Sequence, residues 1–275
     1  MNQSTSTAHA EAGDPLLRAT GTAESSLPTL LNAGRMCLAA SALGLGVLGI
    51  VTGDFALNWQ PVPQWIPGRA TLAYVTAVLF LILGTGLLVE RYKYQFAVAI
   101  AATFVVWAVL LHGPGVVGNP LHVMPWLGFT ERLEVAAGAF MLAATQLPGT
   151  DLARRGMLVA RIAFGVSLPV FGIAHWVYPQ FTADMIPAFI PAHLFWAYFT
   201  GAGHFIAGIA ILTNVLARLA AILFAAMVSG FVLLLHVPRV IGDPDSRVEW
   251  TMLVIAMTMT GAAWCMAGAR LRPRG

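Results

Sequence analysis

The chain has 275 residues, 58% of them hydrophobic and only 10% charged, with a formal net charge of +3. Because soluble domains carry roughly one-quarter charged residues, this composition excludes a water-soluble globular protein and indicates a membrane protein. The sequence contains two cysteines and no Cys/His spacing typical of a metal site, so we expect neither a disulfide framework nor a bound metal. Its basic residues form no cluster of the kind that binds nucleic acid, which is therefore not an expected partner.

The N-terminal segment differs in composition from the rest of the chain. Residues 1–27 are rich in Ser, Thr, Ala, Gly and Glu and contain few large apolar side chains. Such a segment cannot bury enough surface to offset the entropy of ordering, so residues 1–32 are predicted to be a disordered cytoplasmic tail. The N-terminus lacks the basic patch and short apolar core of a cleavable signal, and the first apolar helix is expected to direct insertion.

Apolar stretches of about 20 residues, the length that crosses the hydrocarbon core of a bilayer, recur along the remaining chain. They show no period-two alternation of the kind that a β-barrel requires, and a helix satisfies its own backbone groups in lipid. We therefore predict an all-α membrane protein with eight transmembrane helices. The expected spans are Ala33–Thr52, Ala70–Val89, Tyr94–Leu111, Thr130–Leu147, Gly156–Trp176, Leu194–Thr213, Ala217–Leu235 and Glu249–Ala267.

The distribution of basic residues orients these spans. Most lysines and arginines fall at one set of helix ends, and only Arg69, Arg132, Arg239 and Arg247 fall at the other. The positive-inside rule then places both termini in the cytoplasm of a multi-pass protein. Tryptophans are predicted to form an interfacial belt at the outer helix ends. They are Trp59, Trp65, Trp126, Trp176, Trp196 and Trp250.

Many residues recur at an offset of 124 along the chain. The offset pairs Tyr74 with Tyr198, and it pairs the stretch HGPGVVGNP, which begins at His112, with HVPRVIGDP, which begins at His236. A common offset across many matches predicts an internal repeat that arose by duplication.

The predicted repeats occupy residues 33–148 and 149–275 and contain four spans each. An even number of spans returns the chain to its starting side, so we expect two parallel four-helix bundles related by an axis along the membrane normal. In both repeats, Pro and Gly after the third span are predicted to end the helix and form a turn. The second repeat is then expected to be six residues shorter, which aligns Glu131 with Glu249.

Histidines and acids gather at the outer helix ends, and the second repeat holds more of them. Phe80 and Arg69 of the first repeat stand where the second has His204 and His193. Histidines that share one side of a membrane protein with acids are candidates for ligand binding or proton handling, so the preferred site lies in the second repeat. Its predicted residues are His175, His193, Tyr198, His204, His236, Arg239 and Glu249.

His204 is predicted to lie deepest, about 15 Å from the outer end of its span. A polar group near the middle of the bilayer is costly unless it has a partner. Its helix face carries the small residues Ala197, Gly201 and Gly208, which allow another helix to approach closely. Two interpretations stay open: a neutral imidazole that hydrogen-bonds a neighbouring helix, and a ligand-binding or proton-handling group.

The acids of the fourth span in each repeat also have two interpretations. Glu131, Glu134 and Glu249 are interpreted first as charges near helix N-termini, where the helix dipole favours them. The alternative is pairing with His112 or His236 across the bundle. A second candidate site therefore consists of His112 and Glu131.

Three stretches of the second repeat carry a resemblance to a known family: RIAFGVSLPVFGIAHWVYP, IPAFIPAHLFWAYFTGAGHFIAGIAIL and HVPRVIGDPDSRVEW. With them the chain resembles the DoxX-like family of small four-helix bacterial membrane proteins. The first repeat is similar but weaker, so residues 34–270 resemble a tandem, eight-helix DoxX-like protein. The matching positions are His175, Pro191, Tyr198, Gly208, His236, Pro238, Glu249 and Trp250.

The resemblance implies a membrane subunit near the quinone pool, because related proteins are linked with membrane oxidoreductase complexes, including thiosulfate:quinone oxidoreductase. We expect a non-catalytic or quinone-interacting subunit, with lipid, a quinone and an oxidoreductase subunit as partners. Haem is disfavoured as a cofactor, since His204 lies at a different depth from the interfacial histidines. Two alternatives stay open: a carrier or binding protein for a small hydrophobic or anionic molecule, with its cavity between the two bundles, and a purely structural subunit.

Overall fold

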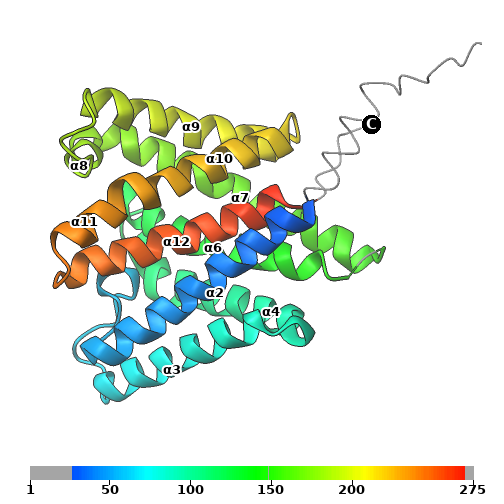
Figure 1. Cartoon of the computed structure of the whole chain (residues 1–275), viewed down its shortest axis with the longest axis horizontal. Helices are drawn as coiled ribbons and strands as arrows, with labels where there is room; N and C mark the ends of the chain where they lie inside the picture. The colour runs from blue at the N-terminus through cyan, green and yellow to red at the C-terminus, as the bar shows by residue number, and fades with distance from the viewer. Residues whose placement is uncertain (1–26, 148, 270–275) are drawn as a thin grey trace, which may run out of the picture.

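The computed structural model describes residues 27–147 and 149–269, and within these ranges it contains helices and no strand (Figure 1). The predicted all-α fold class is confirmed. Residues 1–26 of the expected tail lie outside the described residues, whereas residues 27–32 belong to a helix. We refer below to residues 27–147 as the first half and to residues 149–269 as the second half.

Each half contains four long helices, joined by shorter ones. The first half consists of α2 (Leu27–Thr52), η1 (Leu57–Trp59), α3 (Arg69–Leu88), η2 (Glu90–Tyr92), α4 (Lys93–Trp107), η3 (Ala108–His112), α5 (Gly113–Gly118) and α6 (Val123–Ala144). The second half consists of α7 (Asp151–Val177), α8 (Pro179–Asp184), α9 (His193–Thr213), α10 (Ala217–Phe231), η4 (Val232–His236), α11 (Val237–Gly242) and α12 (Arg247–Ala267).

Seven helical stretches of the described chain are long and apolar enough to cross a membrane. They are α2, α3, the stretch from η2 to α5, α7, α9, the stretch from α10 to α11, and α12. α6 is not among the seven, since Glu131, Arg132 and Glu134 fall within its 22 residues. An integral membrane protein is thus supported by seven candidate spans, and the eighth span stays a prediction.

α6 lies in the middle of the molecule, where α4, α7 and α12 pack against it (Figure 1). It packs closely against α12 at Gly138, where an added Cβ would lie only 2.4 Å from the Cα of Ala262 and would clash with it. A glycine at this position therefore lets the two helices pack side by side. Arg132 and Glu134 are 2% and 0% exposed, so the neighbouring helices enclose the charged stretch of α6.

The first long helix of each half packs against a helix of the other half. α2 packs against α3 and α12, and α7 packs against α9 and α6. The first long helix of each half therefore lies along the last helix of the other half instead of closing a bundle of its own. The two halves therefore share helix contacts along their lengths, whereas two four-helix bundles were expected.

The long helices of the two halves begin at a constant offset along the chain. α2, α3, α4 and α6 each begin 124 residues before α7, α9, α10 and α12. The offset persists into the last helix of each half, because the Trp126 and Trp250 indoles each donate to the carbonyl oxygen six residues earlier, at 2.9 and 2.8 Å. The expected six-residue shortening is therefore wrong, and Ile255 rather than Glu249 stands opposite Glu131.

The third long helix of each half continues past the histidine that was expected to end it. η3 and η4 are π-helical turns with His112 and His236 as their last residues, and the chain continues directly into α5 and α11. A π-turn adds one residue, which moves Pro114 or Pro238 away from the carbonyl that its ring would meet in a regular helix. The Gly-(Asn/Asp)-Pro stretch then ends each helix.

Candidate functional site

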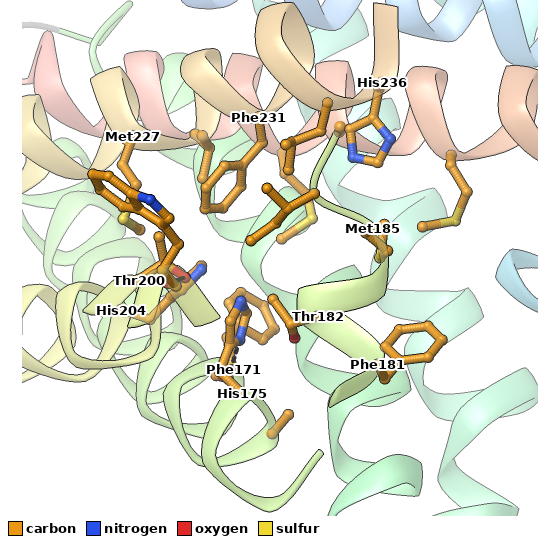
Figure 2. Close-up of a pocket in the computed structure, with 18 of the residues that line it drawn as sticks. Phe171, His175, Phe181, Thr182, Met185, Thr200, His204, Met227, Phe231 and His236 are labelled. Carbon is orange, nitrogen blue, oxygen red and sulfur yellow. Dashed lines mark hydrogen bonds between the residues drawn. The ribbon is translucent and has the colours of Figure 1, made fainter. Parts of the chain in front are cut away.

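The second half contains a cavity of about 730 Å³ (Figure 2). Its walls are α7, α8, α9, α10, η4 and α12, together with one face of α6. Most of the lining side chains are apolar or aromatic, as is typical of small-molecule sites of roughly 300–1,000 Å³. The cavity was expected between two bundles; it lies mainly among the helices of the second half, and α6 is the helix of the first half that lines it.

Three of the predicted site residues meet in this cavity. They are His175 from α7, His204 from α9 and His236 from η4. Figure 2 shows their imidazoles around the same open space. The ring centroids of His175 and His204 are 4.9 Å apart, with the planes tilted by 40°, so the two rings are in contact at the wall of an otherwise apolar cavity.

His204 is the most enclosed of the three, at 3% exposed. Phe171 and Phe224 present their rings edge-on to it, with centroids 5.5 and 5.2 Å away. Neither ring nitrogen has a hydrogen-bond partner among the described residues, so His204 does not form a hydrogen bond to a neighbouring helix. A buried polar group without a partner costs about 1–3 kcal/mol.

Three other polar groups of the cavity form hydrogen bonds within the protein. His175 Nδ1 lies 2.8 Å from the carbonyl oxygen of Phe171. The Thr200 hydroxyl donates to the carbonyl oxygen of Trp196 at 2.8 Å, and the Trp196 indole donates to Pro191 O at 3.1 Å. These bonds fix the orientation of each side chain before any ligand enters.

Four predicted site residues do not line the cavity. His193 begins α9, and Tyr198 is 48% exposed. Arg239 and Glu249 bind each other through two hydrogen bonds of 2.7 and 2.6 Å, which leaves neither free for a ligand. The interpretation of Glu249 as an acid at a helix start agrees with its place in the first turn of α12, where its N–H donates to the Ser246 hydroxyl.

The second candidate site is not assembled. His112 Nε2 lies 3.4 Å from the carbonyl oxygen of Trp59, whereas Glu131 lines the cavity of the second half. α6 begins at Val123, seven residues before the expected start, so Glu131 and Glu134 lie inside the helix and not at its N-terminus. The expected boundary was wrong because the charged residues interrupt the apolar run there.

Arg132 is a structural residue that sequence reasoning placed at the outer surface. Its guanidinium donates to Gly128 O, Trp59 O and the Glu131 carboxylate at 2.7, 2.8 and 2.5 Å. It also lies over the Trp59 ring, 4.2 Å from the centroid. A buried guanidinium needs this many acceptors, since an unpaired buried charge costs several kcal/mol. The signal in the sequence is the Glu-Arg pair within an otherwise apolar run.

The corresponding place in the first half is filled by aromatic side chains. Phe80, Phe104 and Trp107 pack with ring centroids 4.9 to 6.0 Å apart. At the offset of 124, they stand where the cavity has His204, Val228 and Phe231.

Trp59 completes this aromatic cluster. Its ring centroid lies 6.0 Å from that of Phe104, and it is 1% exposed. It is therefore a core residue, although it was expected in the interfacial belt. The first half has no equivalent of the histidine pair, because Phe80 takes the place of His204 and Val51 that of His175.

Comparison with known proteins assigns a family to part of the chain. The DoxX family model matches residues 156–237, a segment that runs from α7 to the start of α11. The resemblance to DoxX-like proteins is confirmed by this match. No curated protein and no solved structure matches the chain. All three histidines of the cavity fall within the matched segment.

Proposed function

We propose that this chain, which carries a DoxX domain at residues 156–237, binds a small, neutral and largely apolar molecule in the cavity beside His204, and that this molecule is a membrane quinone. In this proposal the protein is a membrane subunit of an oxidoreductase complex. The observation that carries the proposal is His204 itself, buried in an apolar cavity with two ring nitrogens that have no partner.

The lining of the cavity favours a neutral ring over an anion. Phe171, Phe199 and Phe231 offer faces and edges for a ring to pack against, and aromatic pairs gain energy beyond the area they bury. None of the described lining residues is Lys or Arg, whereas Glu131 is among them. An anion would meet this carboxylate without a compensating cation, so the alternative of an anionic ligand has less support.

The exposed part of the lining supports a ligand that is dissolved in the bilayer. Phe199 and Leu234 line the cavity and are also 57% and 52% exposed. Both lie on stretches that are long and apolar enough to span a membrane, so lipid would cover these faces. A quinone could then enter sideways between α9 and the α10–η4 stretch without crossing water.

The proposal includes a membrane arrangement. α6 crosses as an eighth span between α4, α7 and α12, the two halves arose by duplication, and both termini face the cytoplasm of a bacterial inner membrane. The constant offset between the element bounds supports the duplication. A reporter enzyme that is active only outside the cytoplasm, fused after residue 275 and separately at residue 119, tests the orientation. Activity is expected from the second fusion alone.

The binding experiment uses the full chain in lipid nanodiscs and a short-chain 1,4-benzoquinone, with calorimetry to measure the dissociation constant. We expect saturable binding that His204→Phe weakens at least tenfold, which corresponds to about 1.4 kcal/mol. Val228→Trp, which fills the cavity from another helix, should weaken binding equally. His122→Ala is the matched control, because His122 is exposed and outside the cavity.

Three outcomes would contradict the proposal. If the wild-type protein binds no quinone while it is folded and co-purifies with its partner subunit, it is a structural subunit. If it binds and also transports the molecule into proteoliposomes, it is a carrier. Identical binding by the wild type and both cavity variants would place the quinone elsewhere on the protein.

A further inference from the structure

The polar groups that line the cavity differ in whether they can still donate or accept a hydrogen bond from a ligand. We infer that the cavity selects its ligand by hydroxyl groups, and that it binds a hydroquinone or another dihydroxylated ring more tightly than the corresponding dicarbonyl form. This inference rests on the proposed function, because it concerns the oxidation state of the ring that occupies the same cavity. It follows from which lining groups have already used their hydrogen atoms.

His175 offers the ligand an acceptor. Its Nδ1 lies 2.8 Å from Phe171 O, and a carbonyl oxygen can only accept, so Nδ1 carries the hydrogen. A neutral imidazole has a single N–H, and Nε2 is therefore left with a lone pair. It can accept a hydrogen bond from a ligand but cannot donate one.

The neutral state of His175 follows from its surroundings. None of the ion pairs in the described part of the chain involves His175. Glu131, the acid of the cavity lining, pairs with Arg132 at 2.5 Å. An imidazolium in this apolar cavity would be a charge without a counter-ion, which is strongly unfavourable.

The hydrogen atoms of two further lining groups are already engaged in hydrogen bonds within the protein. Thr200 uses its hydroxyl hydrogen on Trp196 O, so only its oxygen lone pairs remain. The Trp196 indole has one N–H, and it donates to Pro191 O. Thr200 can therefore only accept, and Trp196 offers a ligand no hydrogen bond at all.

Glu131 is a third acceptor in the lining, because an ionised carboxylate has no hydrogen to donate. Arg132 donates to one of its oxygens, and Glu131 lines the cavity. His204, His236 and the hydroxyls of Tyr178 and Thr182 do not change this balance, since each can both donate and accept a hydrogen bond. A dihydroxy ring supplies hydrogens to these fixed acceptors, whereas a dicarbonyl ring leaves them unmatched.

The experiment compares three probes that share one alkyl chain: a 1,4-hydroquinone, its dimethyl ether and the 1,4-benzoquinone. Calorimetry is done on the full chain in nanodiscs, under anaerobic conditions that keep the hydroquinone reduced. The hydroquinone is expected to bind at least ten times more tightly than the other two. The ether is the matched control, because it keeps the ring oxygens and loses only their hydrogens.

Two variants assign the preference to named acceptors. His175→Phe and Thr200→Val remove the acceptor of each side chain, and each should weaken hydroquinone binding more than quinone binding, so that the ratio of the two affinities falls several-fold. His175→Gln, whose amide oxygen can accept, should recover part of the loss.

The possible results separate the inference from the proposed function. If the quinone or the ether binds as tightly as the hydroquinone, the inference is overturned and the proposed function stands. If none of the three binds, the proposed function itself is overturned. If the preference survives both His175→Phe and Thr200→Val, acceptors elsewhere cause it and the inference is again wrong.

Discussion

The two halves of the molecule share their helix arrangement and differ in what fills it. Phe80 and Phe104 occupy the first half, and His204 and Val228 stand at the corresponding positions of the second. Phe104 closes the space, whereas Val228 is too small to do so and a cavity remains. A few side chains therefore decide whether this scaffold makes a packed core or a binding site.

The halves also differ in how they treat buried polar groups. In the first half, Arg132 is held by three backbone carbonyls and one carboxylate. In the second half, His204 is equally enclosed and has no partner. Proteins accept such local conflicts at functional sites and compensate for them elsewhere, and this contrast can be tested by exchanging residues between the halves.

The largest effect is expected from Arg132→Met. The substitution leaves the Glu131 carboxylate unpaired and frees carbonyl oxygens in the interior, and breaking a buried ion pair in this way costs about 3–5 kcal/mol. Thermal unfolding in detergent micelles should show a large loss. Arg239→Met is the matched control, because Arg239 is partly exposed and its pair contributes under about 1 kcal/mol. Equal losses from the two would contradict the assigned role of Arg132.

The exchange Phe80→His tests the packed half. It replaces a ring that packs against Phe104 and Trp107 by a smaller, polar imidazole, and the lost contacts and the burial of polar atoms together should cost roughly 2–4 kcal/mol. The same unfolding measurement detects it. A neutral result would mean that this half can open a cavity as the second half does.

The reverse exchange, His204→Phe, should raise stability. It removes a buried group with two unmet nitrogens and adds a ring among Phe171 and Phe224, so a gain of about 1–2 kcal/mol is expected from the unmet polar group alone. Unfolding of the ligand-free protein tests this. A loss of stability would show that His204 has a partner, such as an enclosed water molecule.

The smallest effect concerns a contact that joins the halves outside the spans. Asp54 accepts from Arg69 of the first half and lies 3.3 Å from Arg247 of the second. Partial burial opposes its ionisation, but the Phe55 N–H and the two guanidinium groups outweigh this and hold the pKa of its carboxyl below the ordinary value. The stabilisation is therefore present above the ordinary pKa and is lost as pH falls through the lowered one.

Asp54→Asn is the variant that isolates this contribution. It should lower stability by under about 1 kcal/mol at neutral pH, and the difference from the wild type should begin to shrink near pH 4 and vanish below the lowered pKa. Unfolding curves recorded at several pH values measure the difference. A difference that persists at the lowest pH would mean that Asp54 acts through its shape and not through its charge.

Much of the fold was predictable because the hydropathy of a segment and the recurrence of residues along the chain can both be seen directly in the sequence. Apolar length located all the long helices, and the offset of 124 anticipated the matching bounds. The start of α6 was missed because its charges are matched by partners far away in sequence, such as the carbonyl of Trp59. The π-turns were missed because Pro and Gly usually indicate the end of a helix. Here the extra residue of a π-turn accommodates the proline, and the helix continues.

The site was predictable in part. His175, His204 and His236 were chosen as histidines in apolar surroundings, and the structure brings them together. Arg239 and Glu249 were chosen by the same reasoning, but they satisfy each other. Sequence gives the polarity of a residue and not its partner, so it cannot separate the two cases. The aromatic filling of the first half depends on side-chain volumes in three dimensions, which no periodicity reveals.

The enclosure of α6 has a consequence for how the chain enters the membrane during synthesis. A segment with Glu131, Arg132 and Glu134 is a poor candidate to remain among lipids on its own. Two of the helices that shield it, α7 and α12, leave the ribosome later, and α12 is the last of all. The charged stretch of α6 therefore acquires its full shielding only after α12 has been synthesised, and a chain that stops before α12 would leave this stretch exposed on one side.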